Sequence, residues 1–352
     1  MKNASIIQKL NLEQKCALLS GATTFGTRAL PKNNIPSITL SDGPNGVRKQ
    51  AGAADHLGLN PSVPATCFPT AATVACSWDP ALGEQIGQAM GEEAAAQEVA
   101  VLLGPGLNTK RSPLCGRDFE YFSEDSLLSG AMASNEIAGA KSKGVYSFMK
   151  HFALNDQETN RTNMVCTWAN EQSIRETYLK PFEMSVKEGG AQAVMSSFNY
   201  IGYTYAGASS NLLQTVLRGE WGFKGFVLTD YFGGYGYQNA DQEVRAGNDS
   251  MLATTKITNH ITDKSATSVK AMRQAAHNIL YTAANSWQYA NGEPKVATPI
   301  WKTAMYVAWG VTAVLVIGLE IVAIKRYLNR KKAVATVESA AEPVAAGPAN
   351  AE

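Results

Sequence analysis

Two aspartates end apolar stretches of the sequence and could take part in catalysis. Asp230 ends GFVLTD (225–230), and Asp42 ends SITLSD (37–42). A carboxylate at the end of a buried strand is held by rigid backbone and is partly desolvated, which suits a nucleophile or an acid–base group. Each aspartate could instead have a structural role. Asp230 could cap the helix that follows, and Asp42 could form a turn with the Gly-Pro-Asn-Gly segment that follows it.

Cationic and aromatic side chains accompany these carboxylates. Lys150 and His151 end a third apolar stretch, Arg161 follows in NDQETNR, and Arg117 lies in LCGRDFEYFSED. Singly, each could belong to a surface ion pair. Together they suit a polar, uncharged, ring-shaped ligand, because charged groups bind hydroxyls and aromatic faces cover the C–H faces of a sugar. The aromatic candidates are Tyr121, Trp168, Phe198 and Tyr231.

Short apolar stretches alternate with helical patterns along most of the chain. Strands are predicted at 37–42, 98–105, 145–151, 192–199 and 225–230. The spacing of apolar residues predicts helices at 79–97, 171–188 and 265–287. Asp79-Pro80 is typical of a helix start, and Pro181 predicts a kink.

This alternation predicts parallel βα units. Polar residues at successive strand ends are typical of the mouth of a (β/α)8 TIM-type barrel, although a doubly wound open sheet shows the same alternation. No glycine-rich phosphate loop follows the first predicted strand, which disfavours a nucleotide-dependent dehydrogenase. We therefore expect an α/β chain built on a barrel.

The composition excludes several classes of protein. The chain has 352 residues, with 31 Lys or Arg and 30 Asp or Glu, and residues 1–299 hold 25 basic against 26 acidic side chains. Such a neutral chain lacks the basic surface of a nucleic-acid-binding protein, and its length excludes a disulfide-held miniprotein. The five cysteines form no CxxC pair and the four histidines no HExxH pattern, so we expect no metal site and no cofactor.

A membrane-spanning helix is predicted near the C-terminal end, at 303–325. Residues 304–324 carry one charge, Glu320, and as a helix they would extend roughly 31 Å, the thickness of a bilayer core. A buried core helix is the alternative. The basic segment KRYLNRKK (325–332) follows and should stay in the cytoplasm, which places the barrel on the extracellular face. The rest of 326–352 is a low-complexity tail that we expect to be disordered.

The beginning of the sequence does not explain how the barrel would be exported. It has no apolar segment of the kind found in a signal peptide. An extracellular barrel would need some other export signal. Either the charge rule for membrane orientation fails here, or the chain is the C-terminal part of a longer polypeptide that can be exported.

Six motifs give the sequence a family resemblance. Over residues 8–290 it resembles the N-terminal barrel domain of glycoside hydrolase family 3, in which the motifs occur in the same order: LSDGPNGVR, GRDFEYFSED, KHFALNDQETNR, VMSSFNYIG, LRGEWGFKGFVLTDY and AGNDSML. The resemblance implies a (β/α)8 barrel over 1–290, joined by a linker at 291–302 to the membrane helix. It also implies exo-acting release of a terminal β-linked sugar. KHFALNDQETNR is similar to the β-glucosidase branch of the family.

The resemblance assigns roles to individual residues. Asp230 matches the nucleophile of a retaining mechanism that passes through a covalent glycosyl-enzyme. Phe198 stands where tyrosine is usual, and Tyr231 replaces the more frequent tryptophan. Both these residues and Met195 should line the sugar pocket. The residues that match groups holding the sugar hydroxyls are Asp42, Arg117, Lys150, His151 and Arg161.

The resemblance leaves the general acid unassigned. In most of the family this acid is a Glu on an α/β sandwich domain that follows the barrel, where this sequence instead predicts the membrane helix. Asp156 and Glu158 should lie near the mouth, but their motif position indicates scaffolding. We therefore expect the acid to come from a missing or separate sandwich domain or chain. The alternative is a catalytically incomplete, membrane-anchored module that binds or senses a sugar.

Overall fold

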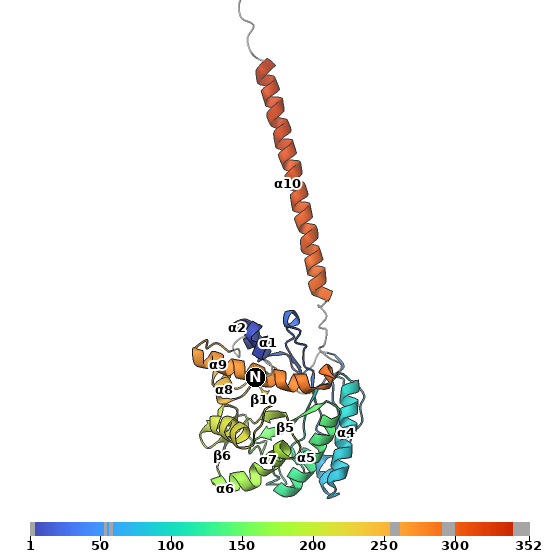
Figure 1. Ribbon diagram of the computed structural model, residues 1–352, viewed down its shortest axis with the longest axis vertical. Coiled ribbons are helices and arrows are strands. Elements are labelled where there is room, and N and C mark those ends of the chain that lie inside the picture. The colour runs from blue at the N-terminus through green and yellow to red at the C-terminus, as the bar shows by residue number, and fades with distance from the viewer. Residues whose placement is uncertain (1–3, 53–54, 56–58, 254–260, 291–299, 341–352) are drawn as a thin grey trace, which may run out of the picture. The chain divides into compact units, whose positions relative to one another are not determined.

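A computed structural model describes residues 4–52, 55, 59–253, 261–290 and 300–340. The chain divides into two compact units, Met1–Val296 and Ala297–Glu352. Figure 1 shows their helices and strands, several of them labelled.

The first unit is built on a six-stranded parallel sheet with the strand order β11-β10-β7-β5-β4-β3. All five predicted strands are confirmed, because each apolar stretch places buried side chains in the sheet. The sixth strand, β11, lies within AGNDSML and was not predicted. The strands are β3 (Leu40–Asp42), β4 (Val101–Leu103), β5 (Tyr146–Phe152), β7 (Ala193–Ser196), β10 (Phe226–Tyr231) and β11 (Ser250–Leu252).

An N-terminal hairpin joins the two edges of this sheet, which is therefore curled. Strand β1 (Gly21–Thr23) pairs antiparallel with β2 (Gly26–Thr27). Ser20 bridges Met251 of β11, and Gly26 bridges Thr39 directly before β3. In the described residues the ring thus consists of six parallel strands and an antiparallel hairpin, rather than the eight parallel strands of the expected repeat.

Helices follow most of the parallel strands, as the βα alternation predicts. The predicted helix starts at Pro80, and the side chain of Asp79 caps it by accepting a hydrogen bond from the backbone N of Ala81 at 3.0 Å. Gly87 and Gly139 allow close packing between α4 and α5, which lie side by side in Figure 1. The helices after β3, β4, β10 and β11 are α4 (Pro80–Ala96), α5 (Ser126–Ser142), α8 (Ala240–Ala246) and α9 (Ala266–Asn285).

The predicted helix at 171–188 is broken into three pieces. A short α6 (Glu171–Ser173) passes into a π-helical turn, Ile174–Tyr178, and then into α7 (Lys180–Lys187). The irregular turn directly precedes Pro181, whose missing N–H cannot continue the hydrogen-bond ladder. A second π-helical segment, Asn211–Glu220, follows β7.

The smaller elements lie in the N-terminal part and in the loops. They comprise helices α1 (Ala4–Lys9), α2 (Leu12–Leu18) and α3 (Ala71–Ala75), and strands β6 (Cys166–Thr167), β8 (Tyr200–Ile201) and β9 (Thr204–Tyr205), which form a separate sheet.

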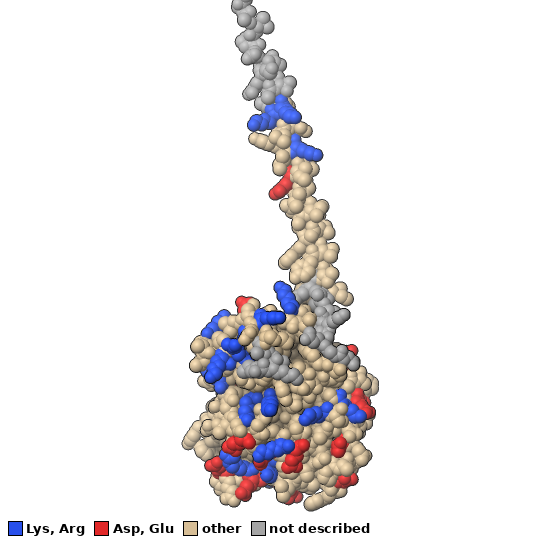
Figure 2. Space-filling view, viewed as in Figure 1, with Lys and Arg blue, Asp and Glu red and all other residues tan. Residues whose placement is uncertain are grey.

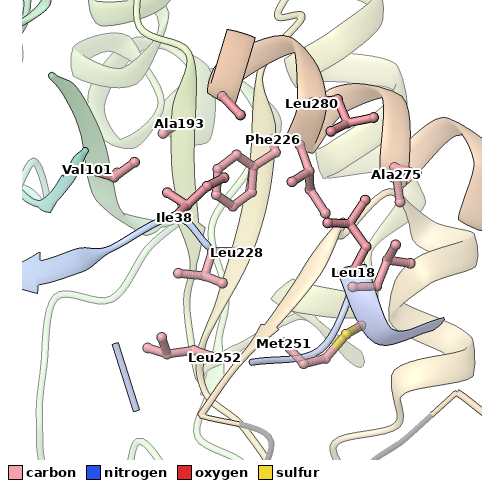
Figure 3. Close-up of a cluster of buried hydrophobic side chains, with 14 of the residues drawn as sticks. Leu18, Ile38, Val101, Ala193, Phe226, Leu228, Met251, Leu252, Ala275 and Leu280 are labelled. Atoms are coloured by element: carbon pink, nitrogen blue, oxygen red, sulfur yellow. The ribbon is translucent and has the colours of Figure 1, made fainter. Parts of the chain in front are cut away.

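Alternating residues of the strands pack on two sides of the sheet. Phe226 and Leu228 point into a cluster that also receives side chains from α2 and α9. Figure 3 shows Phe226 among these neighbours, and its ring meets that of Phe148 edge-on at 4.7 Å. Val227, between them, packs on the opposite side with α5 and α7. This two-sided burial fixes the register of the strands, and with it the positions of the residues at their ends.

The second unit contains one described helix, α10 (Ile300–Ala340). The helix predicted at 303–325 is confirmed as a helix and extends further in both directions. Residues 333–340, which we expected to be disordered, therefore belong to this helix. The rest of the predicted tail, 341–352, and residues 291–299 of the predicted linker lie outside the described residues. The segment Thr303–Ala333 of α10 is long and apolar enough to cross a membrane. Figure 2 shows a stretch of this helix without charged side chains, followed by an acidic side chain and then by basic ones.

Candidate active site

The C-terminal ends of the parallel strands form a pocket. Asp42 comes from the end of β3, Lys150 and His151 from β5, and Asp230 from β10. Eight of the nine predicted site residues line it: Asp42, Arg117, Lys150, His151, Arg161, Met195, Asp230 and Tyr231. The ninth, Phe198, is buried beside it, with the guanidinium carbon of Arg161 4.8 Å from its ring centroid.

Oppositely charged side chains alternate along the wall of the pocket. On one side, Lys150 Nζ lies 3.2 Å from Asp42 Oδ1 and 3.5 Å from Glu120 Oε2. Glu120 also forms an ion pair with Arg117. Because Lys150 and Glu120 are both almost fully buried, each charge depends on the other for compensation.

The same alternation continues to Asp230. Arg117 Nη1 lies 3.7 Å from Glu158 Oε1, and Arg161 Nε lies 3.0 Å from Glu158 Oε2. Arg161 Nη1 in turn approaches Asp230 Oδ2 at 3.6 Å. The charged chain therefore runs through seven side chains, in the order Asp42, Lys150, Glu120, Arg117, Glu158, Arg161 and Asp230.

Asp230 has one carboxylate oxygen that accepts no hydrogen bond from any described residue. Its Oδ1 accepts a hydrogen bond from the backbone N of Tyr231 at 2.7 Å. Its Oδ2 lies 3.6 Å from both His151 Nε2 and Arg161 Nη1 and has no hydrogen-bond partner, although the residue is only 5% exposed. An unsatisfied buried oxygen is unfavourable for folding, and in a pocket it is available to react with a ligand.

His151 is held neutral beside this oxygen. Burial lowers the pKa of His151 well below its usual value, and the nearby cations Arg117, Lys150 and Arg161 lower it further. The Nδ1 of His151 lies 3.2 Å from the hydroxyl of Tyr121 and 3.5 Å from Asn155 Nδ2. Its Nε2 faces Oδ2 of Asp230 at 3.6 Å.

Lys150 and Asp42 remain charged at the opposite wall. Burial alone would lower the pKa of Lys150, but Asp42 and Glu120 outweigh it and raise that pKa. Burial likewise opposes the charge of Asp42, and the neighbouring Lys150 lowers the pKa of Asp42 overall. A fixed ammonium beside a fixed carboxylate can bind two hydroxyls of one ligand, one as donor and one as acceptor.

Comparison with known proteins identifies the family. The model for the glycosyl hydrolase family 3 N terminal domain matches residues 51–284. The chain belongs to glycosyl hydrolase family 3. It is 43% identical over 279 residues to thermostable beta-glucosidase B of Acetivibrio thermocellus, covering 79% of this chain and 36% of that protein. It is also 44% identical over 226 residues to an exo-alpha-(1->6)-L-arabinopyranosidase of Bifidobacterium longum, covering 64% of this chain and 30% of that one.

Solved structures agree with this assignment. Beta-glucosidase 3B of Thermotoga neapolitana, in complex with glucose, matches with a TM-score of 0.73 and 33% identity over 87% of this chain and 46% of that one. The chain thus spans about a third of the length of the two curated relatives and under half of this structure.

Several residues of this family 3 pocket were not among the predicted site residues. Glu120 lies in the quoted motif GRDFEYFSED, three residues after Arg117, and that spacing could have indicated a pair. Arg48 lies in LSDGPNGVR and lines the pocket because its backbone bridges that of Asp42. Phe25 reaches the pocket from the β1–β2 hairpin, which no local pattern indicated. Glu158 takes the scaffolding position expected of it.

The described residues offer no group of three His, Cys, Asp or Glu side chains that could hold a metal ion.

Proposed function

We propose that the protein is a retaining, exo-acting β-glycoside hydrolase of the β-glucosidase type, with Asp230 as its nucleophile. The observation that carries the proposal is Oδ2 of Asp230, which accepts no hydrogen bond from the described residues and lies in a pocket of fixed hydrogen-bonding groups. Retaining enzymes need a carboxylate positioned to attack the anomeric carbon. The names of the curated relatives are consistent with a glycoside substrate.

In this mechanism the charged wall binds the sugar and Asp230 breaks its bond. Asp42, Lys150 and Nε2 of His151 bind hydroxyls, while Oδ2 of Asp230 attacks the anomeric carbon. The bond to the leaving oxygen breaks, and that oxygen takes a proton from a general acid. Water then attacks the covalent glycosyl-enzyme, gives up a proton to the conjugate base of that acid, and releases the sugar with net retention.

We propose that the general acid comes from another domain or chain. The carboxylates of the charged chain other than Asp230, namely Asp42, Glu120 and Glu158, are each engaged in an ion pair with at least one cation of this unit. We therefore assign them to binding and positioning and not to protonation of the leaving group. An α/β sandwich domain that carries a Glu would fill this role.

The exposed apolar side chains of the first unit support a partner at this face. Within its described residues, every large hydrophobic side chain with high exposure lies between a parallel strand and the helix that follows it, or in the first turn of that helix. These segments surround the C-terminal edge of the sheet, where the pocket opens. Exposed apolar side chains mark an interaction site where they form one contiguous patch. The residues are Leu59, Trp78, Leu82, Leu114, Phe119, Leu127, Met164, Trp168 and Tyr203.

A second candidate function is a sugar-binding or sensor module. The ion pairing of Asp42, Glu120 and Glu158 favours it, because binding needs no proton donor. The free oxygen of Asp230 favours the enzyme.

We further propose a domain arrangement around this site. Residues 1–290 form a TIM-type barrel variant closed by the β1–β2 hairpin, and 291–302 form a linker. Residues 303–325 cross a membrane, and 326–352 form the cytoplasmic tail. The length and apolarity of α10 and its basic flank support the span, with the barrel on the extracellular face. Alkaline extraction should leave the full chain in the membrane fraction, and its release would contradict the span.

The nucleophile is tested with an activated 2-deoxy-2-fluoro glycoside, which needs little acid assistance. The full chain should gain the mass of the fluorosugar on the peptide that contains Asp230. The nearly isosteric Asp230→Asn variant should not be labelled. Failure of gluco-, xylo- and galacto-configured probes to label the protein would favour the binding module. Hydrolysis of unactivated alkyl β-glucosides by the full chain alone would contradict a separate source of the acid.

A further inference from the structure

Five basic side chains follow the apolar part of α10 within eight residues. They are Lys325, Arg326, Arg330, Lys331 and Lys332. All five are exposed and belong to one continuous helix. No acidic residue lies between Glu320 and Glu338, so the group is uniformly positive, as the blue side chains in Figure 2 show.

The five charges surround the helix instead of forming one stripe. An α-helix turns by about 100° per residue. Relative to Lys325, the other four side chains project at about 100°, 140°, 240° and 340°. A helix that lies flat in a membrane surface carries its cations on one polar face. A ring of cations instead suits a helix that passes through the surface, with headgroups on every side.

The ring also has the right height for the headgroup layer. Residues 325–332 rise by roughly 10 Å along the helix axis, and the polar layer on each side of a bilayer is about 5–8 Å thick. The opposite end of the apolar segment has Lys302 as its nearest cation. The charge is therefore concentrated at one of the two membrane surfaces.

We propose that this ring, residues 325–332, binds the headgroups of anionic phospholipids around the helix. The inference rests on the proposed membrane span. A phosphate can accept two parallel hydrogen bonds from the guanidinium of Arg326 or Arg330, and the lysines add attraction as point charges. Each cation near an anionic membrane surface strengthens the attraction roughly fivefold. Several such lipids should thus replace neutral ones in the first shell around the helix.

The experiment uses the full chain reconstituted in vesicles of phosphatidylcholine with a minor share of phosphatidylserine in both leaflets. Spin-labelled versions of the two lipids report which one is immobilised at the protein. We expect several-fold selectivity for phosphatidylserine, decreasing as salt is raised. Replacing all five ring residues by Gln should bring the selectivity to about one. The matched control, Lys295→Gln with Lys302→Gln, should retain it.

The outcomes separate the ring from the membrane span. Equal immobilisation of the two lipids by the unaltered chain, or selectivity that survives replacement of the ring, would overturn the lipid proposal and leave the span intact. Immobilisation of neither lipid would mean that α10 is not in the bilayer, and the span itself would then be wrong. A variant that inserts in the opposite orientation still meets phosphatidylserine, because both leaflets contain it. Its lipid selectivity can therefore be compared directly with that of the unaltered chain.

Discussion

The two ends of β10 hold buried aspartates in contrasting surroundings. Beside the start of the strand, Asp249 accepts hydrogen bonds from Arg218 at 2.6 Å, from the backbone N of Val227 at 2.7 Å and from Asn278 at 2.9 Å. At its other end, one oxygen of Asp230 has no hydrogen bond within the described residues and faces Arg161 and the neutral His151, each at 3.6 Å.

The contrast distinguishes a stabilising carboxylate from a reactive one. Both oxygens of Asp249 are satisfied, so a ligand would gain nothing by approaching it, and its contacts connect β10, α9 and a π-helical segment. Asp230 leaves part of its hydrogen-bonding capacity unused within the protein, at a cost in stability. Burial and a nearby arginine are common to both sites, and the unused oxygen is what marks the functional one.

The largest expected effect is on chemistry at the pocket end. Asp230→Asn should lower the rate of labelling by a 2-fluoro glycoside by at least about 10³-fold, because an amide is not a nucleophile. Its melting temperature should change little. Mass spectrometry of the intact protein and thermal unfolding measure the two quantities. Persistent labelling of this variant would place the nucleophile elsewhere.

At the opposite end the expected effect is on stability. Arg218→Met removes the cation that compensates the buried Asp249 and should cost about 3–5 kcal/mol. For a unit of this size, the melting temperature should fall by roughly 10 °C, and the labelling rate of the folded protein should be unchanged. Arg245→Met is the matched control, because Arg245 pairs with Asp263 at the surface and should matter far less. A similar fall in melting temperature for Arg218→Met and Arg245→Met would contradict the stabilising role assigned to the buried Asp249.

An intermediate effect is expected from the carboxylate that restrains Arg161. In Glu158→Gln this guanidinium loses its charged partner at 3.0 Å and should move onto the free oxygen of Asp230. The maximal labelling rate should fall about tenfold or more. The probe concentration that gives half of this maximal rate should change less. Glu183→Gln, which breaks ion pairs on the outer surface of α7, should leave both values unchanged. Equal changes in both values would assign Glu158 a role in sugar binding instead.

The sequence was sufficient to predict the pocket because its residues lie at strand ends. An apolar stretch that ends in Asp42, His151 or Asp230 defines both a strand and the side chain at its end. Parallel pairing then brings these ends to one edge of the sheet. The motif resemblance added Met195 and the role of Asp230, which spacing alone left open.

Other features depend on contacts between distant residues, which no local pattern contains. The hairpin that joins the sheet edges rests on single bridges such as Ser20 to Met251. The neutrality of His151 follows from its burial, from its neighbour Lys150 and from Arg117 and Arg161, which other segments bring close to it. Asp249 lies in the quoted motif AGNDSML, but its partners Arg218 and Asn278 lie about 30 residues away on either side, and only the fold brings them together.

The smallest effect we predict is a pH dependence of stability that differs between the two ends. Because the folded pKa of His151 is depressed, the unfolded chain binds a proton below about pH 6.5 that the folded protein does not. Stability contributed by His151 is thus present above this pH and is lost at about 1.4 kcal/mol per pH unit as pH falls. Burial raises the pKa of Asp249 to about 6 despite Arg218, so its contribution has the opposite sign and is lost as pH rises through that value. Urea unfolding between pH 5 and 7.5 should show that the His151→Gln variant gains stability relative to the unaltered chain as pH falls. If the difference in unfolding free energy between the two proteins stayed constant over this range, His151 would be charged in the folded protein.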